Sequence, residues 1–336
     1  MIFFPAQNFI KKYEILLNII KIYSSNIYFF KKVMKFFIII LIMLIYYYSW
    51  NKTPQICFCS KAREENRYAR QLIEYYLKLG VNKFIFCDNN LKNKEKLSDV
   101  IKDYIDKGLV DIHEDFGSKI GQSEFFQKMY EKYKMKCNWF LFFDFDEYLY
   151  MHSRSGIKIN HLNDFLKLKF FRKCEAILFN WLIYSDNDLV YYDNRTFLER
   201  FPEPVFGVID NTIVKPIVRG GLNKTIFYPK SSNHIPNRKV ISCDSMGRLI
   251  KYYNPFFVSP PVYNYAFIKH FTTKTAEEYC NKIKRGANRN LPYDIDGRIK
   301  LFFKFNKIRE NKIKIFENVF NKNISRKQFK EGLRLK

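Results

Sequence analysis

Apolar and polar residues alternate in two rhythms through the middle of the chain. Short apolar runs that are rich in aromatic or β-branched residues are too short for buried helices and predict buried strands. The segments between them carry apolar residues at helical spacing, and Gly80 is a suitable stop for the first helix. Strands that alternate with helices predict an α/β fold with a mostly parallel sheet flanked by helices. The predicted strands are 55–60, 83–87, 139–143 and 176–181, and the predicted helices are 63–79, 101–107 and 123–134.

Residues 1–50 form a separate apolar and basic zone. Residues 36–50 carry no charge, and Val33 and Met34 bring this run close to the roughly 20 residues that a spanning helix needs. We therefore predict a membrane anchor at 33–50, with a cleaved signal peptide or a helix packed on the domain as alternatives. Lysines are denser before the run than after it, which predicts a cytosolic amino terminus and a catalytic domain on the far side.

The carboxyl-terminal part, 291–336, is predicted to be a basic helical extension of a domain that spans 55–290. Residues 300–336 hold twelve Lys or Arg against three Glu. An interrupted apolar stripe favours a helix that packs on the domain over a helix at a membrane surface. The stripe consists of Leu301, Phe305, Ile308, Ile315 and Val319.

The composition adds a strong positive charge. With 58 Lys and Arg against 33 acidic residues the formal net charge is +25, which would attract polyanions, anionic lipids or phosphorylated small molecules. Codon bias in an A/T-rich genome is an equally good explanation of the lysine excess. The sequence carries no RNP, helix-turn-helix or zinc signature, so we expect no nucleic-acid partner.

The seven cysteines are odd in number and contain no C-x-x-C pair. Three of them fall in apparent buried strands, so we predict small core residues rather than zinc ligands or a disulfide framework. The redox compartment stays open on this evidence. Sequons for N-glycosylation occur at Asn51, Asn194, Asn223 and Asn323, but an Asn-rich chain also produces them by chance.

The apolar run 139–143 ends abruptly in acidic residues. Asp144 and Asp146 are two positions apart and therefore leave the strand on the same side, with Glu147 directly after them. They stand at the strand end where open α/β sheets bind ligands. Two oxygen ligands on one side suit Mg²⁺ or Mn²⁺, with the phosphates of a substrate completing the shell. The alternative is a solvated acidic turn, because D-x-D also occurs by chance.

Several segments together resemble the family 2 and family 92 glycosyltransferases. The resemblance covers about 55–290, and the combination is more specific than any single segment. It implies the GT-A fold, a Rossmann-like α/β architecture, and a hexosyltransferase-like enzyme that moves sugar from a nucleotide-sugar donor to a glycan or glycolipid acceptor, usually with inversion. The matching segments are 61–68, 73–81, 86–90, 139–148, 180–181, 199–201, 215–219, 234–235, 269–274 and 285–286.

Carried over residue by residue, the resemblance implies that Glu65 and Asp88, followed by Asn89, line the nucleoside pocket. Two positions depart from the pattern. Glu64 stands where many relatives have Asn before the Glu, and Tyr76 stands where many have His. Neither departure touches the predicted metal site.

The resemblance also implies that Asp144 and Asp146 hold a divalent Mn²⁺ or Mg²⁺ on the diphosphate of the donor, for example a UDP-sugar, with His270 as third protein ligand. Such an ion would neutralise charge that develops on the leaving diphosphate. Cations that follow or lie in predicted strands are further candidate contacts, because charge-assisted bonds to phosphate are strong. These candidate phosphate ligands are Lys215, Arg219 and Lys274.

An inverting transfer needs a general base near the acceptor hydroxyl. We predict Asp188 in this role, then Asp186 and then Asp244, with a polar turn as the alternative for each. For the whole chain, the alternative is a metal-dependent phosphoesterase or nuclease that uses the same acidic strand end. A single-pass protein of a bacterial inner membrane and a type II Golgi protein both stay open as locations.

Overall fold

The computed structural model describes residues 31, 33–40, 43, 55–115, 120–153, 157–250, 258–286 and 294–325. The chain divides into two compact units, Met1–Thr53 and Pro54–Lys336. In the first unit, residues 33–40 are helical, and most of the remaining predicted anchor, 41–50, lies outside the described residues. Among the residues that the structure describes, no helix has the length and apolar character needed to cross a membrane.

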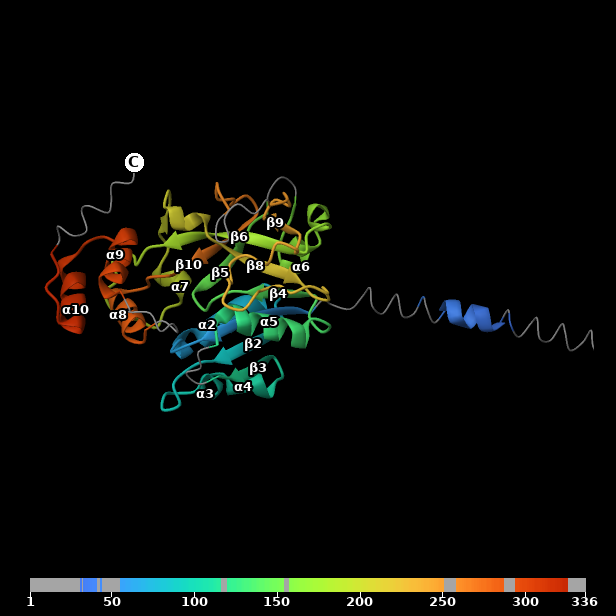
Figure 1. Cartoon of the computed structure of the whole chain (residues 1–336), viewed down its shortest axis with the longest axis horizontal. Coiled ribbons are helices and arrows are strands. Elements are labelled where there is room, and N and C mark those ends of the chain that lie inside the picture. The colour runs from blue at the N-terminus through green and yellow to red at the C-terminus, as the bar shows by residue number, and fades with distance from the viewer. Residues whose placement is uncertain are drawn as a thin grey trace, which may run out of the picture. The chain divides into compact units, whose positions relative to one another are not determined.

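The second unit is built around one mixed sheet of ten strands (Figure 1). The strands are β1 Ile56–Ala62, β2 Lys83–Asp88, β3 Val110–Glu114, β4 Trp139–Phe142, β5 Glu147–Met151, β6 Ala176–Tyr184, β7 Pro204–Val205, β8 Val214–Arg219, β9 Ser242–Asp244 and β10 Ala266–His270. Their main order is β3-β2-β1-β4-β8-β6-β10-β5, and β7 and β9 also pair with β6. Every strand that the sequence predicts is present.

The predicted parallel pairing holds for half of the sheet. Strands β3, β2, β1 and β4 run parallel to one another. Beyond β4 the sheet is mixed, because β8 returns antiparallel between β4 and β6, and β5 runs antiparallel to β10. The turn-rich segment 186–261 supplies this return strand, so the sheet is mixed rather than mostly parallel.

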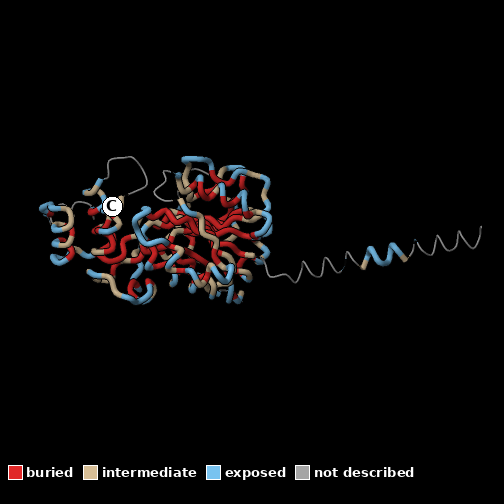
Figure 2. Tube along the Cα trace, turned by 90° about the horizontal axis from the view of Figure 1, so that it is seen from below, coloured by how far each residue is buried: buried red, intermediate tan, exposed pale blue. Residues whose placement is uncertain are grey.

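Helices cover both faces of the sheet. Their bounds are α2 Asn66–Lys78, α3 Leu97–Val100, α4 Lys102–Asp106, α5 Gln122–Tyr133, α6 Leu162–Leu166, α7 Phe197–Arg200, α8 Ala276–Lys284, α9 Ile295–Phe305 and α10 Glu310–Phe320, with short 3₁₀ turns at Lys169–Phe171 and Ile209–Thr212. Figure 2 shows the buried residues concentrated through the sheet and along the inner sides of these helices.

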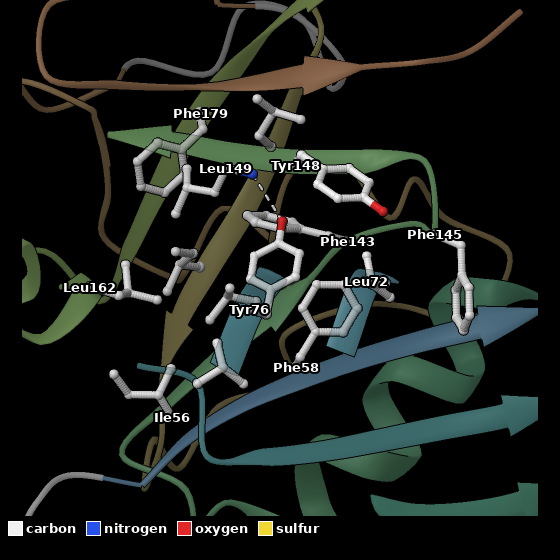
Figure 3. Packing of buried hydrophobic residues seen from close by; sticks show 14 of the residues in the cluster. Ile56, Phe58, Leu72, Tyr76, Phe143, Phe145, Tyr148, Leu149, Leu162 and Phe179 are labelled. Carbon is white, nitrogen blue, oxygen red and sulfur yellow. Dashed lines mark hydrogen bonds between the residues drawn. The ribbon is translucent and has the colours of Figure 1, made fainter. Parts of the chain in front are cut away.

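Strand β1 illustrates how the two faces are filled. Successive side chains of a strand point to opposite faces. Ile56 and Phe58 accordingly pack in the cluster that contains residues of α2, and Cys57 and Cys59 pack in the cluster that contains residues of α5. In the first cluster, the Tyr76 hydroxyl donates to the Glu147 carbonyl at 2.8 Å and accepts from the Leu149 N–H at 2.9 Å (Figure 3). The tyrosine therefore fixes β5 to α2.

The C-terminal helices form a third apolar cluster. Phe302 and Phe303 of α9 and Phe316 of α10 pack with Tyr279 and Ile283 of α8. Figure 1 shows α8, α9 and α10 together at one end of the sheet. The predicted apolar stripe contributes to this packing, as expected for a helix docked on the domain. The stripe residues Ile308, Ile315 and Val319 lie partly buried against the cluster.

Cysteine pairing corrects one prediction. Disulfides join Cys57 to Cys137 and Cys174 to Cys243, with Cα–Cα distances of 5.9 and 5.8 Å. The pairing of β1 with β4 brings the first pair together, and the pairing of β6 with β9 brings the second. Because strand neighbours far apart in the chain create these contacts, cysteine spacing did not reveal them. The described free cysteines are Cys59, Cys87 and Cys280, all buried.

Candidate active site

The acidic residues after β4 stand where several strands end. Residues 143–146 connect β4 directly to β5, which begins at Glu147. Glu147 pairs in register with His270, the last residue of β10, and the Phe271 N–H donates to the Asp146 carbonyl at 2.9 Å. The sheet therefore places Asp146 and His270 side by side, as the sequence predicts for two metal ligands.

Asp144 is held by a buried lysine. The Lys215 ammonium lies 2.8 Å from the Asp144 carboxylate and 3.6 Å from Glu147, and its side chain is fully buried. Gln122 also donates to Asp144. Burial would raise the pKa of Asp144, but the Lys215 charge and the hydrogen bonds from Lys215 and Gln122 together lower that pKa. Burial raises the pKa of Glu147 well above its ordinary value. Lys215 is thus paired with the acidic residues after β4, and its predicted contact with phosphate stays a prediction.

Asp146 is surrounded by three basic side chains. The ammonium groups of Lys274 and Lys282 lie 2.9 and 3.1 Å from its carboxylate, and His270 Nε2 lies 3.6 Å away. Burial would raise the pKa of Asp146, but Lys274 and Lys282 outweigh burial and lower it well below its ordinary value. Burial lowers the pKa of His270, which favours the neutral imidazole. Asp146 is therefore a carboxylate at neutral pH.

A cavity of about 490 Å³ opens beside this cluster. Its wall is strongly cationic, because six basic side chains face three carboxylates. One of those carboxylates, Glu278, is already paired with the buried Arg200 at 2.7 Å. The cavity is lined by Glu64, Glu65, Arg67, Tyr68, Leu91, Lys94, Lys274, Glu278, Asn281, Lys282, Lys284 and Arg285. Such a pocket suits an anionic ligand with several negative oxygens.

Helix α8 supplies much of this wall through its periodicity. Glu278, Asn281, Lys282 and Arg285 are spaced three and four residues apart and so share one helix face. Lys282 and the cavity-lining Arg285 were missed as candidate ligands, although this spacing was visible in the sequence. Arg285 lies 3.3 Å from the Glu65 carboxylate. The predicted ligands Glu65 and Lys274 are both in the wall.

The predicted ligands Asp88 and Asn89 build a turn. The two Asp88 carboxylate oxygens accept from the Asn90 and Leu97 N–H groups at 3.0 and 2.7 Å. The Asn89 side chain donates to the Asp115 carbonyl at 2.6 Å. These bonds shape the connection after β2, so a nucleoside contact by these two side chains stays a prediction.

Arg219 lies at the wrong end of its strand for a phosphate contact. Because β8 runs antiparallel to β4, Arg219 pairs with Trp139 at the start of β4. Arg219 is four positions from Lys215 along the strand, and this spacing corresponds to a distance of about 13 Å. Arg219 donates to the Cys174 carbonyl at 2.7 Å and its guanidinium lies 4.4 Å from the centre of the Trp139 ring. These contacts favour a structural role for Arg219 over the predicted phosphate contact.

The candidate bases carry other contacts. Asp188 lies 2.9 to 3.3 Å from the cationic groups of Lys312, Arg309 and Lys307, and Asp186 lies 2.6 Å from Lys312. These contacts favour a structural role for both carboxylates over the predicted one. Asp244 caps the turn after β9 by accepting from the Met246 and Arg248 N–H groups and from the Arg248 side chain.

The side chains around Asp146 decide whether a metal ion fits this place. Within the described ranges, no three His, Cys, Asp or Glu side chains gather closely enough for one ion. The donor chemistry of Asp146 and His270 nevertheless fits a divalent ion. Buried His270 Nδ1 also lacks a hydrogen-bond partner among the described residues. Lys274 and Lys282 both contact Oδ2 of Asp146, whereas Oδ1 faces His270 Nε2, so the two lysines and a metal need not share one oxygen.

The comparison with protein families decides the class of the chain. The family model described as "Glycosyltransferase family 92" matches residues 55–328. The chain belongs to glycosyltransferase family 92. The predicted resemblance to that family and the predicted enzyme class are thereby confirmed. Comparison with curated proteins finds no match.

Solved structures give a distant likeness. The family 92 chain is similar to S. aureus TarS with a TM-score of 0.34 and 11% identity, over 79% of this chain and 48% of TarS. It thus spans about half the length of that protein. A shorter TarS, 1–349, gives a TM-score of 0.33 at 12% identity, over 80% and 71% of the two chains. The same segment in complex with UDP-GlcNAc gives 0.35 at 12% identity, over 79% of each chain.

Proposed function

We propose that this family 92 chain has the GT-A fold and transfers a sugar from a nucleotide-sugar donor to a glycan or glycolipid acceptor, with inversion. The observation that carries the proposal is the cationic cavity of about 490 Å³ beside Asp146. Its size is within the range of small-molecule sites in proteins. A UDP-sugar is the donor class to test first.

The lysines of the cavity would stabilise the leaving diphosphate. Cleavage of the bond between sugar and phosphate develops negative charge on the leaving group. Lys274 and Lys282 line the cavity and contact Asp146, so they are held in place before a donor enters. Fixed charges that face a developing charge need little reorganisation during the reaction. Arg285, on the same wall, extends the cationic surface.

A divalent ion is part of the proposal. Asp146 and His270 would hold Mn²⁺ or Mg²⁺, which supplies Lewis-acid neutralisation of the diphosphate when bound. His270 Nε2 is the ring nitrogen that faces Asp146, at 3.6 Å, which supports these two residues as a pair of ligands. Lys274 and Lys282 contact Oδ2 of Asp146 and Oδ1 faces His270, so these lysines can keep their positions beside the diphosphate when the ion is bound.

We also propose that the catalytic unit works in an oxidising compartment, on the far side of a membrane anchored at 33–50. The disulfides Cys57–Cys137 and Cys174–Cys243 support this location, because such bonds persist mainly outside the cytosol. A full-length protein that is extracted from membranes by high salt alone would contradict the anchor. Alkylation of all four cysteines without prior reduction would contradict the compartment.

The test of function uses the full-length protein with a panel of UDP-, GDP- and CMP-sugars. Nucleotide release is measured with and without Mn²⁺, first with water and then with glycan acceptors. We expect one donor class to release nucleotide, Lys282→Ala to lose this activity, and Arg219→Met to keep it as the matched control. Hydrolysis of nucleic acid without any use of nucleotide sugars would instead support the phosphoesterase alternative.

A further inference from the structure

The loop after β6 is held by the C-terminal segment. The Lys312 ammonium lies 2.6 Å from Asp186 and 2.9 Å from Asp188, and its side chain is fully buried. Asn306 Oδ1 accepts from the Asp186 N–H at 2.6 Å. We call these four residues the clasp. The clasp joins segments more than 110 residues apart in the chain, since Asp186 and Asn306 are 120 positions apart.

One side of the clasp reaches the predicted donor site through Asn306. Its side-chain amide donates to the Thr273 hydroxyl at 3.0 Å. Thr273 is followed by Lys274, which contacts Asp146 at 2.9 Å and lines the cavity. A shift of Asn306 would therefore move the backbone that carries a cavity lysine.

The loop itself contacts helix α8 and one residue of the cavity wall, Arg67. The Tyr192 N–H donates to the Glu277 carboxylate at 2.8 Å, and the Glu277 N–H donates to the Val190 carbonyl at 3.0 Å. The guanidinium of Arg67, a cavity residue in α2, lies 4.7 Å from the centre of the Tyr192 ring. The loop thus lies between the C-terminal helices and the cavity wall.

The backbone of the loop needs this support. Asn187 and Asp188 have positive φ angles of 49° and 59°. This left-handed conformation is uncommon for residues with side chains, although Asn and Asp tolerate it best. Such conformations persist where the surroundings hold them. The Asp186 carboxylate accepts from the Asp188 N–H at 3.0 Å while it contacts Lys312, so one carboxylate fixes both the turn and the C-terminal helix.

The same helices support α8 from behind. Tyr279, Cys280 and Ile283 of α8 pack in one cluster with Phe302 and Phe316 of the C-terminal helices. The opposite face of α8 carries the cavity residues. The position of the cationic wall therefore depends on α9 and α10.

We propose that Lys312 is a positioning residue for sugar transfer, and that Asp186 and Asp188 act through the clasp and not as the general base. This inference rests on the proposed function. It makes the C-terminal helices α9 and α10, which the family model also covers, part of the working site.

The charges around Asp188 support the assignment. Bonds from Arg309, together with Lys312 and Lys307, hold the pKa of Asp188 far below its ordinary value. A general base works best when its pKa lies near the operating pH. A carboxylate shared among three cations is therefore a poor proton acceptor but a strong tether.

The test is a double-mutant cycle in the full-length protein. Turnover and donor binding are measured for Lys312→Met, Asp188→Asn and the double variant. If Asp188 acts through Lys312, the double variant should lose no more turnover than the worse single variant, because both changes open the same contact. We expect each single variant to lose roughly 10- to 100-fold, since misplacement by about 1 Å can cost 10²-fold. Calorimetry should still detect the donor.

Two further variants keep the test decisive. Lys314→Met removes a lysine of the same helix that is 65% exposed and pairs with Glu310, so it should leave turnover unchanged. If Lys312→Met does not fold, Arg309→Gln replaces it in the cycle, because Arg309 is 56% exposed and contacts Asp188 at 3.1 Å.

The opposite results would overturn the inference. A base should cost the same factor, about 10²–10⁴, whichever residue stands at position 312. If the losses of the two single variants multiply in the double variant, Asp188 acts independently of Lys312 and returns to the role of base. If Lys312→Met keeps full turnover, the clasp does not contribute to sugar transfer. A wild-type protein with no nucleotide-sugar activity would refute the proposed function itself, which is a separate outcome.

Discussion

The two ends of the central strands are held by different kinds of interaction. At the carboxyl end of β4, Asp144 and Asp146 are balanced by buried or half-buried lysines. At the amino ends of the same strands, the disulfides Cys57–Cys137 and Cys174–Cys243 join segments covalently. Ion pairs can exchange partners when a charged ligand enters, and covalent bonds cannot. The difference indicates that stability is concentrated at one end and chemistry at the other.

The largest effect should come from breaking the charged end. Asp146→Asn removes the carboxylate that contacts Lys274 and Lys282 and that we propose as metal ligand. Loss of metal or counter-charge is worth several kcal/mol, so turnover should fall at least about 10³-fold. Nucleotide release and circular dichroism should show an inactive but folded protein.

Asp244→Asn is the matched control for this change. Asp244 is also buried and paired with an arginine, but its bonds close a turn after β9. Its loss should affect stability and leave turnover per folded molecule intact. Near-normal turnover in Asp146→Asn would place the chemistry elsewhere.

Changes at the amino ends of the strands should alter the free energy of unfolding. Joint replacement of Cys174 and Cys243 by Ser removes a disulfide between residues that are 69 positions apart in the chain. We expect the free energy of unfolding to fall by about 2–5 kcal/mol, with unchanged turnover per folded molecule. Denaturant titration with and without reductant measures the first quantity. Cys280→Ala, which removes a described free thiol and keeps both disulfides, is the control, and reductant should lower its free energy of unfolding as much as that of the unchanged protein.

A single strand allows the sharpest comparison of the two ends. Lys215 and Arg219 both belong to β8, four positions apart. Lys215→Met should abolish turnover because it leaves Asp144 without its cation. Arg219→Met should keep turnover but lower the free energy of unfolding by about 1–3 kcal/mol, because buried carbonyls lose their donor. Equal losses of turnover in the two variants would contradict a division of roles in which one end of the strands serves catalysis and the other serves stability.

The sequence predicted features that depend on local order. Strand β4 and the acidic residues that follow it could be recognised because a short aromatic run ends abruptly at Asp144. Lys215, Glu65 and Lys274 were also singled out from the sequence: Lys215 contacts Asp144, Glu65 and Lys274 line the cavity, and their predicted contacts with the donor stay predictions. In each case the residue stands at or beside the carboxyl edge of the sheet.

Features that depend on distant pairing could not be predicted in the same way. The direction of β8 decides that Lys215 and not Arg219 reaches the acidic cluster, and no local pattern fixes that direction. The disulfides follow from strand order for the same reason. The contact of Lys312 with Asp186 joins residues 126 positions apart, so Asp186 and Asp188 looked like isolated acids in a polar turn.

The smallest effect concerns Glu64, which departs from the Asn found in many relatives. Glu64 is exposed, lines the cavity and has a positive φ of 52°. Asn adopts this left-handed conformation more readily than Glu. Glu64→Asn should therefore raise the free energy of unfolding by roughly 0.5–1 kcal/mol, within the penalty for such a conformation. It also removes a negative charge from the cationic wall, so donor affinity should rise slightly at low salt and less at high salt. Glu64→Gln separates the two effects, because it removes the charge without a residue suited to positive φ. Equal stabilisation by Gln and Asn in denaturant titrations would contradict the backbone explanation, and unchanged donor affinity in both would contradict the electrostatic one.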